Sequence, residues 1–309
     1  MEILKTNLED FKNIENWEYK ENFHTVNSRH GDINIHYVDE NSDKDETILL
    51  MHGNPTWGYL YRNMIDPLKD EGYRVVVPDL PGFGKSDKFT SRYHYTYEEF
   101  VDWMSQWIEG VNLKNITLFC QDWGGLIGLR LASKYDDRFN RIVAANTGLP
   151  TGKAPLNTGF LIFKEFMNIK EDLHVAGQVR NGTNGLDQTA LDAYNAPFPD
   201  ETYKQGVRQF PNLVPSSPMT PSRKFNEEAW EKLKKWQKPF LCAFSDNDPI
   251  FAGVENSFLK HIPGCENMPH VTIENAGHFL QEDNPDACVN AIMSICLLYT
   301  SPSPRDKTV

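Results

Sequence analysis

The sequence contains no apolar run long enough to span a membrane. Its first residues also lack the long apolar stretch of a signal peptide. Basic residues do not balance the acidic ones: 31 lysines and arginines stand against 43 aspartates and glutamates, which gives a net charge of −12 at pH 7. This excess of negative charge argues against nucleic acid and against an anionic membrane as partners. We therefore expect a cytoplasmic protein that binds neither.

Cysteine is also scarce, and no internal repeat is present. The five cysteines are Cys120, Cys242, Cys265, Cys288 and Cys296. Their irregular spacing fits neither a disulfide framework nor a metal site. We therefore predict buried thiols, no metal ion and no organic cofactor.

Short apolar, β-branched runs alternate with amphipathic stretches along most of the chain. This alternation is typical of an α/β protein with a mostly parallel sheet flanked by helices. The predicted strands cover residues 33–38, 47–52, 73–78, 116–121, 141–146, 239–245 and 270–274. The predicted helices cover residues 58–69, 97–111, 123–134, 226–236, 255–261 and 285–295.

The strand pattern stops after Asn146 and resumes at Pro239. Between them, the chain is richer in glycine, proline and asparagine and in short helical pieces. We predict a core made of residues 1–149 and 229–295, with a largely helical cap inserted over residues 150–228. A chain of 309 residues is long enough for a large core with such an insertion.

The last fourteen residues, 296–309, differ from the rest of the chain. They are similar to the translation of a transposase adapter used for sequencing libraries, and they interrupt a predicted helix that ends at Ile295. We therefore predict a non-native, disordered tail and exclude it from fold reasoning. A genuine disordered segment rich in serine and proline is the alternative.

The most informative motif is Cys-Gln-Asp-Trp-Gly-Gly, residues 120–125, directly after a predicted strand. Small residues on both sides of a central side chain are typical of a sharp strand-to-helix turn that presents a nucleophile. Here the central residue is Asp122, where many hydrolases of this layout place a serine. An exposed aspartate is ionised at pH 7 and can attack a saturated carbon without a base. The motif therefore favours dehalogenation or epoxide opening over ordinary ester hydrolysis.

Three further groups follow predicted strands, where open α/β sheets hold their sites. The turn His-Gly-Asn-Pro, residues 52–55, can present the backbone N–H of Asn54 to an oxyanion, and the N–H of Trp123 supplies a second donor. Asp248 follows the strand 239–245, and His278 follows the last strand. The order Asp122, Asp248, His278 is that of nucleophile, acid and base in α/β-hydrolases.

The expected roles follow from the chemistry of these groups. Asp122 forms an ester with the substrate carbon, and His278 then takes a proton from the water that attacks the ester. Asp248 accepts the Nδ1–H of His278 and so fixes its tautomer. Asp246 is the alternative acid. The indole N–H of Trp123 is a suitable donor for a departing halide in a dry pocket.

The chain resembles the haloalkane dehalogenases, in the branch whose acid follows the late strand. The resemblance extends from about Leu4 to Ile295 and includes Asp-Leu-Pro-Gly-Phe-Gly-Lys-Ser-Asp at residues 79–87, Ala-Pro-Phe-Pro-Asp-Glu at 196–201 and Gly-His-Phe-Leu-Gln-Glu at 277–282. It implies an α/β-hydrolase fold with a helical cap. It also implies that Asp122, Asp248 and His278 form the triad and that Trp123 binds halide.

One feature departs from that branch, which usually carries a second halide-binding tryptophan on the first cap helix. No tryptophan occurs between Trp123 and Trp230, and Phe163 stands at the corresponding position, beside Phe160 in the expected substrate pocket. Phenylalanine has no N–H donor. Other branches use an asparagine after the His-Gly pair, and Asn54 occupies that position here.

The sequence therefore predicts hydrolysis of a small apolar haloalkane to an alcohol and a halide ion, by a monomer. An epoxide hydrolase with the same ester is the nearest alternative, and Tyr194 and Tyr203 are available to protonate an epoxide oxygen. A β-lactone-processing hydrolase and a non-catalytic ligand-binding relative are further alternatives.

Overall fold

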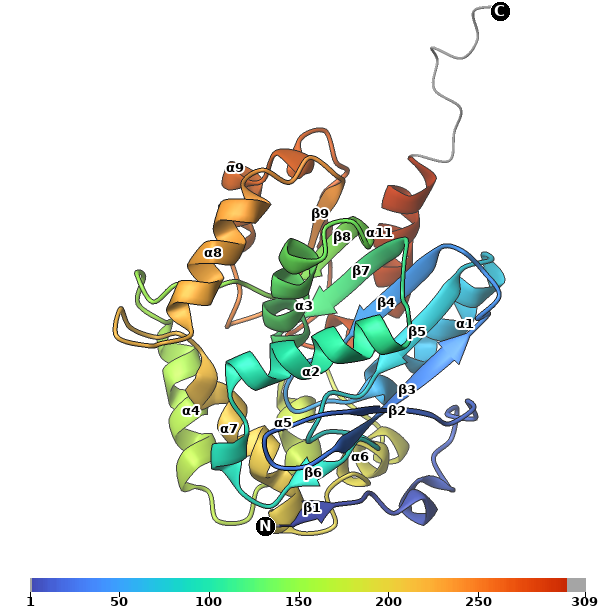
Figure 1. Cartoon of the computed structure of the whole chain (residues 1–309), viewed down its shortest axis with the longest axis vertical. Coiled ribbons are helices and arrows are strands. Elements are labelled where there is room, and N and C mark those ends of the chain that lie inside the picture. The colour runs from blue at the N-terminus through green and yellow to red at the C-terminus, as the bar shows by residue number, and fades with distance from the viewer. Residues whose placement is uncertain (1, 299–309) are drawn as a thin grey trace, which may run out of the picture.

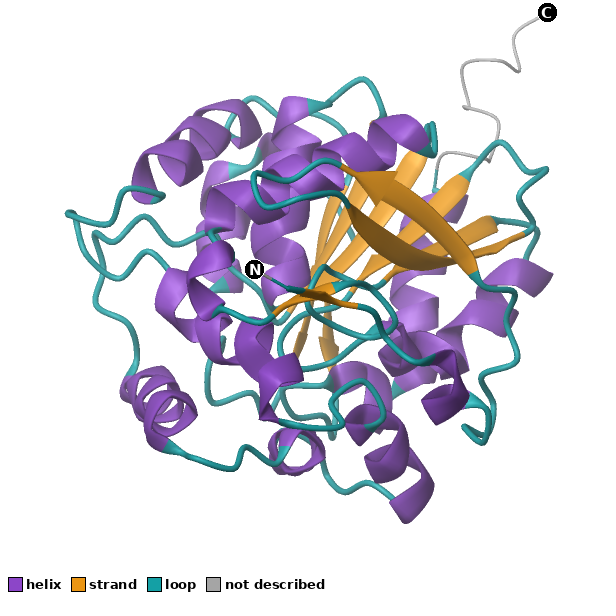
Figure 2. Ribbon diagram, turned by 60° about the horizontal axis from the view of Figure 1, so that its bottom comes forward, coloured by secondary structure: helices purple, strands orange, loops and turns teal. Residues whose placement is uncertain are grey.

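The computed structural model describes residues 2–298. Eight strands form one sheet in the order β10-β9-β8-β7-β4-β5-β3-β2, and β1 pairs with β6 in a separate two-stranded sheet. Figure 2 shows the large sheet as a twisted layer with helices on both sides. The strands are β1 Ile3–Leu4, β2 Asn22–Val26, β3 Ile33–Glu40, β4 Thr47–Met51, β5 Arg74–Pro78, β6 Lys88–Phe89, β7 Ile116–Gln121, β8 Phe139–Ala145, β9 Phe240–Ser245 and β10 Val271–Ile273.

Helices cover most of the remaining chain (Figure 1). The α-helices are α1 Arg62–Asp70, α2 Tyr97–Gly110, α3 Trp123–Lys134, α4 Thr158–Ile169, α5 Val175–Asn181, α6 Gln188–Asn195, α7 Gln205–Leu213, α8 Arg223–Leu233, α9 Glu255–His261, α10 Leu280–Asp283 and α11 Pro285–Leu297. The 3-10 helices are η1 Leu8–Phe11, η2 Gly58–Tyr61, η3 Arg92–His94, η4 Glu201–Lys204 and η5 Pro263–Cys265. Within residues 2–298, no helix is both long and apolar enough to cross a membrane.

The central strands are buried on both faces because their side chains alternate between two apolar clusters. In β4, Leu49 and Met51 pack with residues of α2 and α3, whereas Ile48 and Leu50 pack with residues of α1 and α11. Such continuous apolar runs are expected where helices cover both faces of a parallel sheet. The pairs from β5 through β4, β7, β8 and β9 to β10 are all parallel, so their carboxyl ends meet at one edge. This confirms the predicted α/β-hydrolase fold class.

The segment between β8 and α8, residues 146–222, carries α4 to α7 and is called the inserted segment below. Figure 1 shows these helices grouped below the sheet. The predicted cap boundary at 228/229 falls inside α8, which packs against α3. In α8 the side-chain amide of Asn226 donates to the carbonyl of Pro150 at 2.8 Å.

The first two residues of the predicted tail, Cys296 and Leu297, belong to the last helix. Helix α11 continues through Leu297, and Cys296 is fully buried with its thiol 3.7 Å from Thr117 Oγ1. Residues 299–309 lie outside the described part of the chain. All five cysteines are buried free thiols, as predicted.

Candidate active site

Asp122 lies at the turn between β7 and α3 with φ of 50° and ψ of −126°. This backbone conformation is strained for a residue with a side chain. It is held by hydrogen bonds from the Asp122 N–H to the carbonyl of Asn146 at 3.0 Å and from Thr147 Oγ1 to the Asp122 carbonyl at 2.7 Å. A Cβ at Gly124 would lie 2.0 Å from the carbonyl oxygen of Met51, so the turn requires glycine there.

The Asp122 carboxylate faces the turn that follows β4. Its Oδ1 accepts a hydrogen bond from the backbone N–H of Asn54 at 2.7 Å. A Cβ at Gly53 would lie 2.3 Å from the same oxygen, so this approach also requires glycine. The side chain is only 14% exposed, which corrects the expectation of an exposed aspartate.

Burial has the largest effect on the pKa of the Asp122 carboxyl. Burial raises the pKa of its carboxyl above the ordinary value, against the opposing effects of the His278 charge and of hydrogen bonds from the backbone N–H groups of Asn54 and Trp123. The same N–H groups that hold the carboxylate are placed to hold an oxyanion on its carbon.

His278 lies between two carboxylates. Its Nδ1 is 3.0 Å from Asp248 Oδ2, and its Nε2 is 3.7 Å from Asp122 Oδ2. Burial alone would lower the pKa of His278, but Asp248, through charge and hydrogen bond, and then Asp122 raise it above the ordinary value. Burial alone would raise the pKa of Asp248, but the charge of His278 and its hydrogen bond hold that pKa below its ordinary value. The fold thus brings Asp122, Asp248 and His278 together.

The two candidate acids differ in what they contact. Asp246 accepts the backbone N–H groups of Asn275 at 3.0 Å and Ala276 at 3.1 Å, and it is exposed. Asp248 is buried against His278. The geometry therefore favours Asp248 as the partner of the imidazole.

Two further residues at strand ends hold the histidine and were not singled out from the sequence. Gln121 Nε2 lies 3.1 Å from both Nε2 and the carbonyl oxygen of His278. Asn146 Nδ2 donates to the carbonyls of Gly277 at 3.0 Å and His278 at 3.1 Å. The one sequence feature that could have identified them is their position at the ends of β7 and β8, next to the predicted site.

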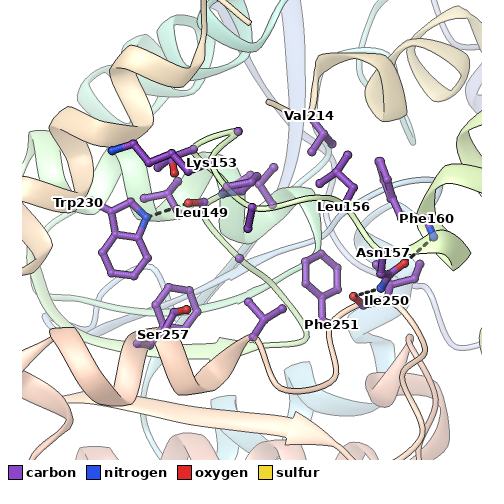
Figure 3. A pocket seen from close by; sticks show the side chains of 18 of the residues that line it. Leu149, Lys153, Leu156, Asn157, Phe160, Val214, Trp230, Ile250, Phe251 and Ser257 are labelled. Atoms are coloured by element: carbon purple, nitrogen blue, oxygen red, sulfur yellow. Dashed lines mark hydrogen bonds between the residues drawn. The ribbon is translucent and has the colours of Figure 1, made fainter. Parts of the chain in front are cut away.

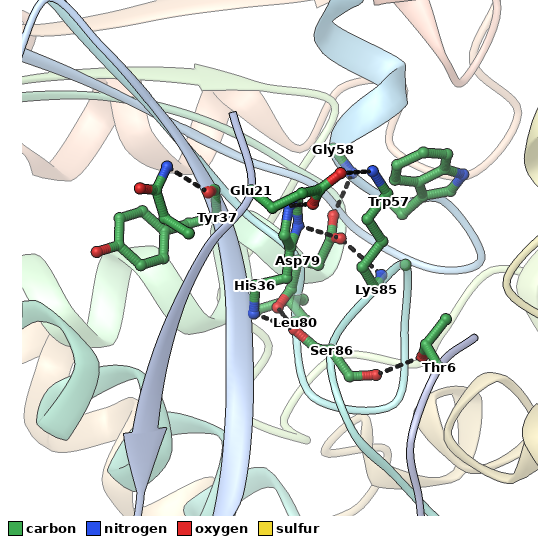
Figure 4. A network of polar contacts seen from close by, with 12 residues as sticks. Thr6, Glu21, His36, Tyr37, Trp57, Gly58, Asp79, Leu80, Lys85 and Ser86 are labelled. Carbon is green, nitrogen blue, oxygen red and sulfur yellow. Dashed lines mark hydrogen bonds and ion pairs between the residues drawn. The ribbon is translucent and has the colours of Figure 1, made fainter. Parts of the chain in front are cut away.

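A buried polar network contacts the chain just after the Asn54 turn, at Gly58 (Figure 4). Asp79 accepts hydrogen bonds from the N–H of Gly58 at 2.7 Å and of Lys85 at 2.8 Å. Its Oδ2 also lies 2.8 Å from Nδ1 of the buried His36, whose Nε2 lies 2.7 Å from Glu21. Against the effect of burial, Asp79 and then Glu21 raise the pKa of His36. The buried ion pair between His36 and Asp79 therefore holds the backbone near Gly58 and Lys85 in place.

His52 makes two hydrogen-bonding contacts that hold the same turn. Its Nδ1 lies 2.9 Å from the carbonyl oxygen of Gly53, and its Nε2 accepts the N–H of Leu80 at 2.9 Å. Burial lowers the pKa of His52, which favours the neutral ring that these contacts require.

Trp123 follows the turn directly, and its ring is fixed by neighbouring aromatics. It stacks on Phe210 with centroids 4.4 Å apart and meets the edge of Tyr97 at 5.0 Å. In residues 2–298, the hydrogen bonds of the protein leave the Trp123 indole N–H without an acceptor, and the buried Oδ1 of Asn54 has no partner. Both side chains line the cavity described next, so these polar groups are free to contact a ligand.

Two cavities meet at Asp122. The smaller has a volume of about 210 Å³ and is lined by Asn54, Trp123, Phe163, His278 and others. The larger, drawn in Figure 3, has a volume of about 920 Å³ and extends between α8, α9 and the chain around Leu149. Phe160 lines both cavities, and Phe163 lines the smaller one.

The tyrosines that an epoxide hydrolase would need do not reach these cavities. Tyr194 is fully buried and its hydroxyl donates to Glu282. Neither Tyr194 nor Tyr203 lines the smaller or the larger cavity. The smaller cavity is therefore lined by Trp123, which carries an indole N–H, and by neither tyrosine hydroxyl.

Comparisons with known proteins agree with this geometry. The family described as alpha/beta hydrolase fold matches residues 46–285. A haloalkane dehalogenase of Psychrobacter cryohalolentis is 49% identical, covering 99% of this chain and 100% of its own length, and one of Mycolicibacterium paratuberculosis is 43% identical, covering 95% and 98%. The chain belongs to the haloalkane dehalogenases. It is a hydrolase that acts on carbon–halide bonds.

A solved structure gives the same assignment. The haloalkane dehalogenase of Paraglaciecola agarilytica NO2, described as tetrameric, superimposes with a TM-score of 0.88 at 33% identity, covering 97% of this chain and 100% of the other. The identities to dehalogenases of 43% and 49% place hydrolytic dehalogenation of haloalkanes above the epoxide and β-lactone alternatives.

Proposed function

We propose that dehalogenation proceeds through an ester on Asp122, with Asp248 and His278 as acid and base. The observation that carries this proposal is the position of the Asp122 carboxylate, with one oxygen on the Asn54 N–H at 2.7 Å and the other facing His278 Nε2 at 3.7 Å. A water molecule that attacks the ester carbon would lie within reach of that nitrogen.

In the first step, a carboxylate oxygen of Asp122 attacks the halogenated carbon, the carbon–halogen bond breaks and the halide leaves with the bonding electrons. Burial favours this step because a desolvated carboxylate is a stronger nucleophile than a hydrated one. The halide is received by the Trp123 indole N–H and by the Asn54 carboxamide, since Phe163 has no donor. If the Asn54 carboxamide made no such bond, the site would lack one charge-assisted hydrogen bond relative to a two-tryptophan site, at a cost of about 1.5–3 kcal/mol.

In the second step, His278 takes a proton from water as the oxygen attacks the Asp122 carboxyl carbon. The backbone N–H groups of Asn54 and Trp123 hold the oxyanion that forms. The alcohol then leaves and Asp122 is restored, so that haloalkane and water give alcohol, halide and one proton. Asp248 stabilises the imidazolium that exists between these events.

In this scheme, the inserted segment is a cap that keeps water from the halide site, and it supplies Phe160 and Phe163 to the pocket wall. The proposal includes a monomeric enzyme in the cytoplasm. The tetramer described for the Paraglaciecola agarilytica protein makes the oligomeric state a point to measure by analytical ultracentrifugation.

The test combines halide release with mass spectrometry. Purified protein should release bromide from a short bromoalkane, and the matching epoxide should be a poor substrate. His278→Phe should accumulate an alkyl adduct on the peptide that contains Asp122, whereas Asp122→Ala should form none. An adduct elsewhere, or wild-type turnover by Asp122→Ala, would exclude the mechanism.

A further inference from the structure

Gln121, the last residue of β7, is a fully buried glutamine that contacts both the backbone and the ring of His278. Its Nε2 lies 3.1 Å from the carbonyl oxygen of His278 and 3.1 Å from the ring nitrogen Nε2. A carbonyl oxygen can only accept a hydrogen bond, so the nitrogen end of the amide has to face the histidine. The amide therefore presents an N–H donor, and not its oxygen, to His278 Nε2.

This donor favours one protonation state of the ring. A neutral imidazole with its proton on Nδ1 has a lone pair on Nε2, which can accept the Gln121 N–H. An imidazolium carries a second proton on Nε2, and this N–H would point at another N–H donor. The amide cannot turn over to offer its oxygen without losing its bond to the His278 carbonyl. The contact therefore stabilises the neutral imidazole relative to the imidazolium.

The charged groups that face the ring act in the opposite direction. Asp248, from the loop after β9, lies 3.0 Å from Nδ1, and Asp122, from the turn between β7 and α3, lies 3.7 Å from Nε2. Burial lowers the pKa of His278, but Asp248 and then Asp122 raise it above its ordinary value. Two uncharged aromatic rings also contact the imidazole, those of Phe251 and Phe279.

Other charges close to this loop are already paired. In α10, which follows His278, Glu282 is paired with Arg62, and Asp283 accepts backbone N–H groups. Helix α5 approaches the loop through Gly182, which has no side chain. Within residues 2–298, the two carboxylates described above are the only anions within ion-pair distance of the ring. The buried amide at the end of β7 is therefore the polar contact that opposes them.

We propose that Gln121 is a positioning residue that keeps His278 neutral, with Nε2 unprotonated and ready to accept a proton from water. This inference rests on the proposed function, in which His278 is the base of ester hydrolysis. If the amide donor is removed and the size of the side chain is kept, the pH midpoint of ester hydrolysis should rise, because more of the base is protonated at each pH. Loss of a merely structural contact would lower the rate without moving the midpoint.

The experiment compares the wild type with Gln121→Met and Gln281→Met. Methionine is close to glutamine in length and has no N–H donor. The alkyl ester is formed with 1-bromobutane, and its single-turnover decay is followed by rapid quench across pH. The midpoint should be higher by roughly 0.5–1 pH unit in Gln121→Met. Gln281 is the matched control, because it is also fully buried but its amide lies 3.4 Å from the Tyr61 hydroxyl rather than at the imidazole. Its substitution should leave the midpoint at the wild-type value.

A titration of the resting protein tests the same claim without turnover. Nitrogen NMR of protein labelled with isotope-enriched histidine follows the imidazoles, and the spectrum of His278→Phe identifies the His278 signal among the nine histidines. This signal should titrate at higher pH in Gln121→Met than in the wild type. Gln121→Leu should shift both midpoints in the same direction, so the result does not depend on one variant, and thermal melting verifies that each variant is folded.

The outcomes separate this inference from the proposed function. If the wild type forms no ester on Asp122, the proposed function fails, and the titration of the resting protein still decides the role of Gln121. If folded Gln121→Met and Gln121→Leu titrate where the wild type does, or at lower pH, the amide does not favour the neutral imidazole and the inference is overturned. An equal shift in Gln281→Met would also overturn it, because the loss of any buried amide would then have the same effect.

Discussion

The backbone N–H of Phe279 donates a hydrogen bond to the carbonyl of Gly182 at 3.1 Å. Phe279 follows His278 directly, and Gly182 ends α5 in the inserted segment. The contact is reinforced by Asp283, which accepts the N–H of Gly277 at 2.7 Å and that of Asn184 at 2.8 Å. The loop that carries the imidazole is therefore held by the inserted segment as well as by the core.

Gly182→Ala should slow ester hydrolysis more than ester formation. A Cβ at Gly182 would lie 2.7 Å from the Phe279 ring and 3.3 Å from the His278 Cβ, so the loop must shift. Its φ of −98° suits alanine, which leaves crowding as the cause of the effect. A displacement of about 1 Å can cost roughly 100-fold in a positioned step. Rapid-quench kinetics with a bromoalkane measures the two steps separately.

Gly177→Ala is the matched control in the same helix. The nearest neighbour of its added Cβ is 3.5 Å away, an ordinary contact, and alanine favours the helix by roughly 0.5–1 kcal/mol. Its kinetics should match the wild type. Equal kinetics in both variants would mean that the Gly182 contact does not position the base.

The pH dependence of ester hydrolysis should report the raised pKa of His278. Water activation requires the neutral imidazole, so the rate should rise with pH through the pKa of His278, which Asp248 raises and to which the uncharged Asp122 ester no longer contributes. Asp248→Asn removes the negative charge that contributes most to this raised pKa. Its midpoint should move to lower pH, and its maximal rate should fall because the tautomer is no longer fixed. Single-turnover decay of the ester, measured across pH, gives both quantities.

Asp246→Asn serves as the control for that experiment. Asp246 accepts backbone N–H groups and does not contact His278, so the midpoint should stay where it is in the wild type. A shift in Asp246→Asn with none in Asp248→Asn would reverse the assignment of the acid.

Asp79→Asn should destabilise the fold by about 3–5 kcal/mol, because it leaves the buried His36 without its main counter-charge. The pKa of Asp79 is held below 3.8 by His36 against burial, so the contribution of Asp79 is present above that pH and is lost as pH falls. The pKa of His36 is raised, so its contribution is complete below 6.5 and is lost as pH rises through the raised value. Urea unfolding at several pH values tests both directions.

Asp39→Asn is a comparison in which the ion pair that is broken is partly exposed to water. Asp39 makes a two-point contact with Arg74, each at 2.7 Å, but both side chains retain 12–14% exposure. Water compensates for part of the loss there, and a cost of about 1 kcal/mol is expected. If Asp79→Asn and Asp39→Asn lower the free energy of unfolding by similar amounts, the buried pair of Asp79 and His36 does not have the expected importance.

The core of the fold was predictable because the central strands are continuous apolar runs. The helices between them have apolar residues at regular helical spacing. The predicted bounds of β7 and α3 match the structure. β2 was missed because its residues alternate between half-buried and exposed, and an edge strand needs no apolar run. The bounds of α4 to α7 were not predicted, since short helices depend on their contacts more than on their own pattern.

The proximity of the three residues proposed as the triad was predictable for a related reason. Parallel strands place the residues after their carboxyl ends at one edge, so Asp122, Asp248 and His278 meet although they are far apart in sequence. The roles of Gln121 and Asn146 were not predictable, because an amide at a strand end has no motif that tells which carbonyl it will bind. Residues of the inserted segment, Phe160 and Phe163 among them, line the cavity at Asp122, and the local sequence around Asp122 carries no sign of this.

Phe163→Trp should strengthen halide binding. Phe163 lines the smaller cavity with Asn54 and Trp123, and an indole there can supply a second N–H donor to the leaving group. A donor whose hydrogen bond strengthens as negative charge develops lowers the barrier to ester formation. The gain should be about 1.5–3 kcal/mol, seen as tighter bromide binding and a faster alkylation burst even if a later step limits turnover.

The companion change is Asn54→Ala, which removes the carboxamide but keeps the backbone N–H that holds Asp122. It should weaken bromide binding in the natural protein more than in Phe163→Trp, because the added indole N–H can still donate a hydrogen bond to the bromide. Phe163→Tyr is the control for ring size and polarity, since its hydroxyl would lie farther from the helix than an indole N–H. Bromide titrations of tryptophan fluorescence, with thermal melting to verify folding, measure the series. If bromide affinity and the alkylation burst are unchanged in all three variants, and the variants are folded, Trp123 alone receives the halide.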